Sequence, residues 1–181
     1  MNGPTHSSTS KYGLALQFDG VNDMVTVPDA NSLDLTTAMS IEAWVRPTAL
    51  GSWRTVVLKE RPGDLVYALY AGSRFENSNT WRPSAWIGSD PVGATAALTL
   101  NAWTHLATTY DGASWKFYVN GTLVASRAFA APIGVSTGAL RIGGNNIWPE
   151  WFKGQIDEVR IYSRALSAAE VVLDRDAPIA P

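Results

Sequence analysis

The chain has no cysteine among its 181 residues. It can therefore form no disulfide framework, offer no thiolate nucleophile and build no zinc–thiolate site. A secreted domain without disulfides needs a large core or a bound metal to resist unfolding. The length is sufficient for one well-buried domain, and single all-β domains commonly reach this size.

A strong charge of either sign is also missing. The chain carries 14 basic and 16 acidic residues, for a formal net charge of -2. Such a balance produces no long-range field that would concentrate an anionic polymer, so neither nucleic acid nor an anionic membrane is an expected partner. No apolar run approaches the roughly 20 residues of a membrane span, so membrane insertion is not expected.

Alternation of apolar and polar residues recurs along most of the chain and is typical of strands with one buried face. In residues 41–45, Ile41, Ala43 and Val45 form an aliphatic face, while Glu42 and Trp44 lie on the other. Further strands are expected at 14–18, 24–27, 54–60, 65–70, 84–88, 103–110, 114–119, 122–128, 139–143 and 153–162. This pattern predicts an all-β fold of two antiparallel sheets packed face to face.

Three local motifs predict how strands and a helix are joined or begin. Asn120-Gly121 favours the left-handed conformations of a two-residue hairpin turn, and Asp111-Gly112 predicts a second hairpin. Ser167-Ala168-Ala169-Glu170 has the spacing of a capping box. A helix of about two turns is therefore expected near the C-terminus.

Five segments, in order along the chain, resemble LamG-like jelly-roll domains of the laminin-G and concanavalin A-like lectin type. They are residues 15–25 (ALQFDGVNDMV), 40–47 (SIEAWVRP), 101–112 (NAWTHLATTYDG), 117–121 (FYVNG) and 154–166 (GQIDEVRIYSRAL). The resemblance covers about residues 12 to 172 and implies a jelly-roll β-sandwich. It also implies a binding or adhesion module, usually non-catalytic and often with a structural calcium, within a large secreted or surface protein.

The resemblance also suggests how the chain is organised. Family members usually begin with another strand upstream, so we interpret the chain as part of a longer protein, with an extracellular or cell-surface location and neighbouring domains. The N-terminus lacks the basic and then apolar segment of an export signal. Residues 1–11 are expected to be an N-terminal segment that leaves the sheet edge open or fills it, and residues 12–173 the sandwich. Residues 174–181 have the proline and alanine content of a linker.

A cluster of oxygen-bearing side chains makes calcium the expected ion. Asp19, Asn22 and Asp23 lie within five residues, and a sandwich that brought Asp157 alongside would add another carboxylate. The resemblance supports this set, because relatives hold calcium near the matching first and last segments. The alternative is a simple turn, since Asp, Asn and Gly form turns without any ion.

A glycoside hydrolase of the same fold is the enzymatic alternative. The laminarinase and agarase type places Glu-x-Asp-x-Glu on one strand, which projects two glutamates into one cleft. The nearest match here is Gln155-Ile156-Asp157-Glu158-Val159, in which both glutamate positions are filled by other residues. His6 and His105 form neither a metal triad nor a nucleophile system. We therefore expect no catalysis.

Eight tryptophans are a high number for this length, and their positions suggest different roles. Trp44, Trp103 and Trp115 fall within expected strands and are predicted to build the sandwich. Others lie beside glycine, proline, serine or asparagine, where loops are expected. An exposed indole offers a stacking surface for the apolar face of a sugar ring. The alternative is that these rings fold back over the rim of the core.

The function that we expect from the sequence is non-catalytic binding of a glycan or polysaccharide, or adhesion. The predicted ligand contacts combine indoles for stacking with amides for hydrogen bonds, and they are Trp81, Asn145, Asn146, Trp148 and Trp151. The alternative is a structural or protein-binding spacer without glycan affinity. Glu42 and Arg160 each lie amid apolar neighbours, where a charge is either solvated on an outer face or paired. The family resemblance implies partial burial and mutual pairing between the strands, as a structural feature.

Overall fold

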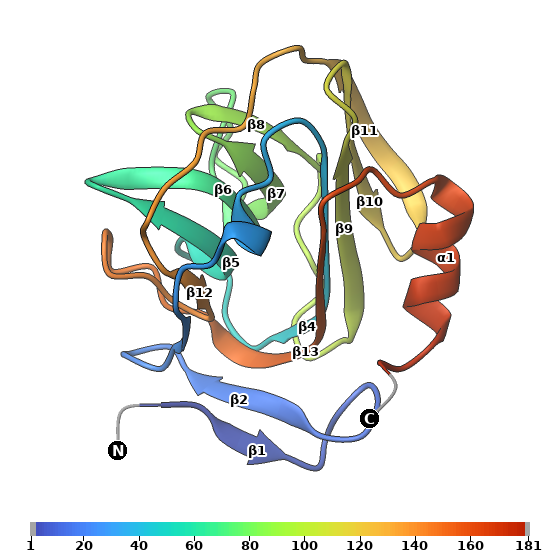
Figure 1. Cartoon of the computed structure of the whole chain (residues 1–181). Coiled ribbons are helices and arrows are strands. Elements are labelled where there is room, and N and C mark those ends of the chain that lie inside the picture. Colours follow the sequence, from blue (N-terminus) through green and yellow to red (C-terminus); the bar gives the residue numbers. More distant parts are fainter. Residues whose placement is uncertain (1–2, 180–181) are drawn as a thin grey trace.

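The computed structural model describes residues 3–179 as a jelly-roll sandwich of two antiparallel sheets, as the sequence predicts (Figure 1). The seven-stranded sheet has the order β1 (Thr5–Ser7), β2 (Ala15–Asp19), β13 (Lys153–Tyr162), β4 (Met39–Pro47), β9 (Thr104–Tyr110), β10 (Ser114–Val119), β11 (Thr122–Ala128). The six-stranded sheet has the order β3 (Val25–Val27), β12 (Leu140–Ile142), β5 (Arg54–Arg61), β6 (Asp64–Ser73), β7 (Arg82–Ile87), β8 (Asp90–Gly93). A short 3-10 turn (Asn31–Leu33) and the helix α1 (Ala168–Asp176) complete the described elements.

The hydrophobic core lies between the two sheets. The long strands contribute alternate side chains to it, because successive residues of a strand point to opposite faces. Ile41 and Val45 enter from β4, Leu69 from β6 and Phe117 from β10, all without solvent exposure. Trp115 is also fully buried in this core, as expected.

The predicted turns and helix are confirmed. Val119 pairs with Thr122, and between them Asn120 and Gly121 have φ angles of 52° and 76°, as a two-residue hairpin requires. The second hairpin joins β9 to β10 through a loop at residues 111–113. At the helix start the Ser167 side chain accepts from the backbone of Glu170, whose side chain in turn accepts from the backbone of Ser167.

The first and last described segments both form regular structure that belongs to the sandwich. β1 pairs with β2, so residues of the N-terminal segment fill the sheet edge. At the other end α1 continues to Asp176, so residues 174–176 are helical and not linker. β8, which contains Pro91, was not expected, because proline removes a backbone donor and is confined to sheet edges or bulges. None of the helices in residues 3–179 is long and apolar enough to span a membrane.

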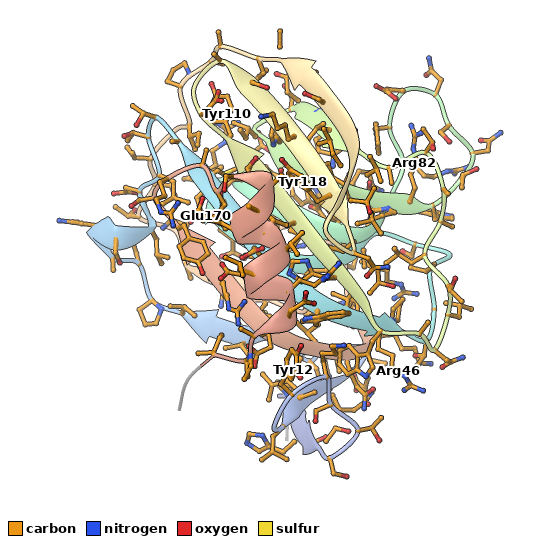
Figure 2. The ribbon with its side chains drawn as sticks, turned by 90° about the vertical axis from the view of Figure 1, so that its right-hand side faces the viewer. Tyr12, Arg46, Arg82, Tyr110, Tyr118 and Glu170 are labelled. Carbon is orange, nitrogen blue, oxygen red and sulfur yellow. The ribbon has the colours of Figure 1, made fainter. Side chains whose placement is uncertain are left out.

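Helix α1 covers the outer face of the seven-stranded sheet, on the side away from the six-stranded sheet (Figures 1 and 2). Trp44 points to this outer face and not into the core between the sheets. Its side chain is buried beneath the helix, and its Nε1 donates to the Arg175 carbonyl at 3.2 Å. Trp103 lies just before β9 and is only half-buried. Of the three tryptophans predicted to build the sandwich, Trp115 lies in the core between the sheets, whereas Trp44 and Trp103 do not.

Glu42 and Arg160 are neighbours but do not form the predicted pair. They face each other across β4 and β13, and Glu42 is fully buried. Arg160 bonds instead to the Glu158 carboxylate at 2.9 Å and to the carbonyl of Asp174 in α1. The helix carbonyls and Glu158 thus satisfy the guanidinium, and neither Glu42 oxygen has a hydrogen-bond partner among the described residues.

Candidate functional site

The outer face of the six-stranded sheet carries a pocket of about 600 Å³. On β7, Ala85 and Ile87 point into the core, so Trp86 between them points outwards. The aromatic side chains that line the pocket are Trp53, Tyr70, Trp86 and Trp148. The other lining residues are Ser52, Asp64, Leu65, Gly88, Ser89, Pro149 and Glu150.

The aromatic rings form inclined walls and not one flat platform. The Trp53 ring centre lies 5.1 Å from that of Tyr70 at an interplanar angle of 73°, and 5.6 Å from that of Trp86 at 59°. The three indoles are half-buried, whereas Tyr70 is 1 % exposed and lies deepest. A ligand in this pocket would therefore meet aromatic surface from several directions.

Asn145 organises the loop that carries Trp148. Its Oδ1 accepts from the backbone N–H groups of Ile147 and Trp148 at 3.0 and 2.7 Å. Its Nδ2 donates to Thr55 Oγ1 at 3.1 Å and to Glu150 Oε2 at 2.9 Å. This one side chain ties the loop to β5 and to the pocket carboxylate.

Glu150 supplies a largely buried carboxylate at the pocket. Its Oε2 accepts from Tyr70 Oη at 3.0 Å, Asn145 Nδ2 at 2.9 Å and Thr55 Oγ1 at 3.4 Å. Burial raises the pKa of Glu150, and the three hydrogen bonds oppose the rise. Burial and the nearby Glu150 also raise the pKa of Tyr70, which keeps its hydroxyl protonated as the donor.

The five predicted ligand contacts have different surroundings. Trp148 lines the pocket, and the Trp81 ring packs edge-on against the pocket residue Trp53 at 6.4 Å. Asn145 is 1 % exposed and fully bonded within the protein, so it shapes the pocket instead of facing a ligand. The remaining two are not part of the pocket lining: Asn146 is exposed, and Trp151 packs against Gly144.

Sequence reasoning missed Trp86, Tyr70 and Glu150 and left Trp53 without a role. A usable signal was present for Trp86: in the segment Ala85-Trp86-Ile87 the flanking aliphatic residues mark the core face, so the indole must be on the outer face. Tyr70 and Glu150 carry no such local signal, because only the folded sheet brings β6 and the loop before β13 together.

The four predicted calcium ligands do not converge. Asp19 pairs with Lys153, and Asp157 lies four residues further along β13, about 13 Å at a rise of about 3.3 Å per residue. Asp157 Oδ2 instead accepts the backbone N–H groups of Lys11 and Tyr12 at 2.9 and 3.0 Å. Within residues 3–179, no three acidic, histidine or cysteine side chains are grouped to hold a metal.

The turn around Gly20 fits the alternative of an ordinary turn better than a calcium site. Asp19 Oδ1 accepts from the backbone of Val21 at 2.8 Å and of Asn22 at 3.3 Å. Both Asp23 oxygens accept backbone N–H groups, from Gly3 and from Asp19. The aliphatic stem of Lys153 packs against Gly20. The predicted ligand set does not fit this geometry, and calcium stays a prediction.

Residues 155–159, which match the Glu-x-Asp-x-Glu motif of the laminarinase type in position, do not line one cleft. A bulge between Asp157 and Arg160 changes which side chains face outwards. Gln155 bonds to Ser7 Oγ at 2.7 Å and to Arg46, whereas Val159 packs against the core. Neither of these positions offers a carboxylate, so the constellation of the laminarinase type is not assembled here.

Comparison with known proteins identifies the family. A stretch of 79 residues is 33% identical to pappalysin-1 of Mus musculus and covers 41% of this chain but only 5% of that protein. Domain 4 of AbnA, an extracellular arabinanase from Geobacillus stearothermophilus solved with arabinotriose, matches with a TM-score of 0.79 and 23% identity over 97% of this chain and 82% of its own. The binding domain of Paraclostridial Mosquitocidal Protein 1 matches with a TM-score of 0.68 and 17% identity over 96% of this chain and 45% of its own. Because the model of the concanavalin A-like lectin/glucanases superfamily matches residues 19–172, the chain belongs to that superfamily.

Proposed function

We propose that this domain is a non-catalytic carbohydrate-binding module of a larger extracellular or cell-surface protein, and that its glycan binds in the pocket on the outer face of the six-stranded sheet. The observation that carries the proposal is the set of three half-buried indoles, Trp53, Trp86 and Trp148, around one hollow of about 600 Å³. Pockets of this size are common for small ligands, and exposed aromatic groups of this kind mark binding surfaces.

The chemistry of the pocket suits a sugar. The indole faces offer stacking surface to the apolar C–H faces of a pyranose or furanose ring. Ser52, Ser89 and Glu150 offer groups that can bond to ring hydroxyls. A domain of similar structure was solved in complex with arabinotriose, and another is the binding domain of a mosquitocidal protein.

A glycan array with the intact domain, followed by titration of the strongest hit, tests the proposal. We expect saturable binding that falls more than tenfold in Trp86→Ala and in Trp148→Ala, because a buried aromatic anchor of an interface contributes about 2 kcal/mol or more. Trp103→Ala is the matched control, since it removes a half-buried indole outside the pocket lining.

Two results would contradict the proposal. If Trp103→Ala and Trp86→Ala lower the affinity equally in folded protein, the glycan does not bind in this pocket. If no glycan binds and a protein partner does, the domain is a protein-binding spacer instead.

A further inference from the structure

The charged groups of the pocket are all of one sign. Asp64 and Glu150 line it, and none of its lining residues is lysine, arginine or histidine. Asp64 is partly balanced by an ion pair with Arg61, but both side chains of that pair are substantially exposed and therefore screened by water. Glu150 has no basic partner among the described ion pairs.

Glu150 also has unused bonding capacity at the pocket. The residue is only 9 % exposed, and its Oε2 receives all three of the hydrogen bonds that the described residues make to this carboxylate. Oε1 receives none of them, yet it is not among the completely buried atoms that lack a partner, so it keeps some exposure in a residue that lines the hollow. A carboxylate oxygen in a poorly hydrated recess interacts strongly with an opposite charge.

The aromatic walls have the same electrostatic preference. The face of an indole or phenol ring carries negative potential and attracts a cation within about 6 Å of the ring centre. The half-buried rings of Trp53 and Trp86 are inclined at 59° to each other, above the buried Tyr70, so they present aromatic surface in more than one direction, as a cage for a cation does. Aromatic faces and carboxylates together repel an anion.

We infer that the pocket selects its sugar by charge: it favours a protonated amino sugar, accepts a neutral sugar more weakly and rejects a uronic or other acidic sugar. The inference rests on the proposed function, since it names the class of glycan for the same pocket. The ammonium group would lie between Glu150 Oε1 and the aromatic rings, where the contacts to both are favourable.

Three probes of nearly equal size and shape test the charge preference without any assumption about the sugar. They are tetramethylammonium, tert-butanol and pivalate, which carry positive, zero and negative charge. Binding is followed by the NMR shifts of the tryptophan indole N–H groups at constant ionic strength. We expect tetramethylammonium to bind most tightly and pivalate least, with about a 2- to 30-fold gap between the cation and the neutral probe, the range for a cation–π contact.

Two variants assign the preference to this pocket. Glu150→Gln keeps an oxygen acceptor for Tyr70 and Asn145 but removes the charge, so the gap between cation and neutral probe should narrow. Asp90→Asn is the control, because it removes a charge from the neighbouring strand β8, outside the lining residues. Equal affinity for the three probes, or a gap unchanged in Glu150→Gln, would overturn the inference.

A second binding experiment, with sugars of different charge, distinguishes failure of this inference from failure of the proposed function. Three oligomers with the same β-1,4-linked glucose backbone are compared, together with the strongest hit of the array. One carries amines, one carries only the hydroxymethyl and hydroxyl groups of glucose, and one carries carboxylates. Glycan binding without the charge order leaves the proposed function intact and refutes the inference. The charge order among the small probes, with no glycan bound in any arm, supports charge selection by the pocket and refutes its assignment to sugars.

Discussion

Asn145 Nδ2 donates to Glu150 Oε2 at 2.9 Å, and this bond joins the side chain that shapes the pocket loop to the carboxylate that faces the pocket. The same amide holds Trp148 in place through its backbone N–H. One buried side chain therefore links the conformation of the loop, the placement of one indole and the carboxylate that Tyr70 and Thr55 also hold.

Asn145→Ala should lower both stability and ligand binding. The change removes four hydrogen bonds and leaves the buried Thr55 hydroxyl and Glu150 carboxylate with fewer partners, which costs about 1–3 kcal/mol for such groups. Urea unfolding measures the stability, and titration of the array hit measures the affinity. Asn146→Ala is the control: its side chain is exposed, and it bonds to Glu60 through its backbone, so stability should be unchanged. If Asn145→Ala retained full affinity, the loop would not depend on this amide.

The strand pattern was predictable because it is local. Alternation, the Asn120-Gly121 turn and the Ser167 capping box each depend on a few neighbouring residues, and each is found in the structure. The pocket was not predictable to the same degree. A register shift in β5 between Thr55 and Val57 leaves both Val56 and Val57 in the core, so alternation alone does not place Thr55, which bonds to the pocket residue Glu150.

The placement of Asp157 shows the same limit for the predicted ion site. Asp19 and Asp157 lie on adjacent strands, β2 and β13. Whether the two carboxylates meet depends on the register between those strands, and this register separates them. The partners of Asp157, the backbone N–H groups of Lys11 and Tyr12, lie in a segment whose composition carries no signal for that contact.

Trp44→Ala should remove most of the folded protein's stability. Truncation of a buried tryptophan costs about 3–5 kcal/mol, against a total of about 5–15 kcal/mol for a domain. Trp44 is 6 % exposed between β4 and α1, packs against His105 and bonds to the Arg175 carbonyl. Hydrogen exchange should therefore show loss of protection first in residues 168–176. A variant that melts cooperatively within a few degrees of the parent would contradict this role of Trp44.

Asp157→Ala should lower the melting temperature equally in calcium and in a chelator. Its carboxylate holds the N-terminal segment through Lys11 and Tyr12, far from the Asp19 turn, so the loss comes from hydrogen bonds and not from an ion. Thermal melts of parent and variant under both conditions measure this. Any calcium response of the parent should persist in Asp157→Ala and disappear in Asp19→Ala. If Asp157→Ala abolished the response, the carboxylate would be an ion ligand after all.

The buried acid beneath α1 creates a pH dependence whose sign can be derived. Burial and then the nearby Asp174 carboxylate raise the pKa of Glu42 from 4.5 to about 8. Glu42 Oε2 lies 3.6 Å from His105 Nε2, and burial together with Arg160 and Arg175 lowers the pKa of His105 from 6.5 to about 4. Both groups are therefore neutral in the folded protein near pH 7, and their contact is not an ion pair.

Between pH 6.5 and 8 we expect stability to fall as pH rises. In this window unfolded Glu42 is ionised whereas folded Glu42 keeps most of its proton until pH approaches 8, so unfolding releases protons. Unfolded His105 is half protonated at pH 6.5 whereas folded His105 is neutral, so its proton uptake on unfolding opposes the fall at the lower end of the window and fades as pH rises. The slope for one proton is at most about 1.4 kcal/mol per pH unit. Urea unfolding at the two pH values should show the fall in the parent and in the control Asp90→Asn, but not in Glu42→Gln. A parent whose stability is the same at both values, or a Glu42→Gln variant that keeps the parent's slope, would mean that Glu42 is not the group that titrates.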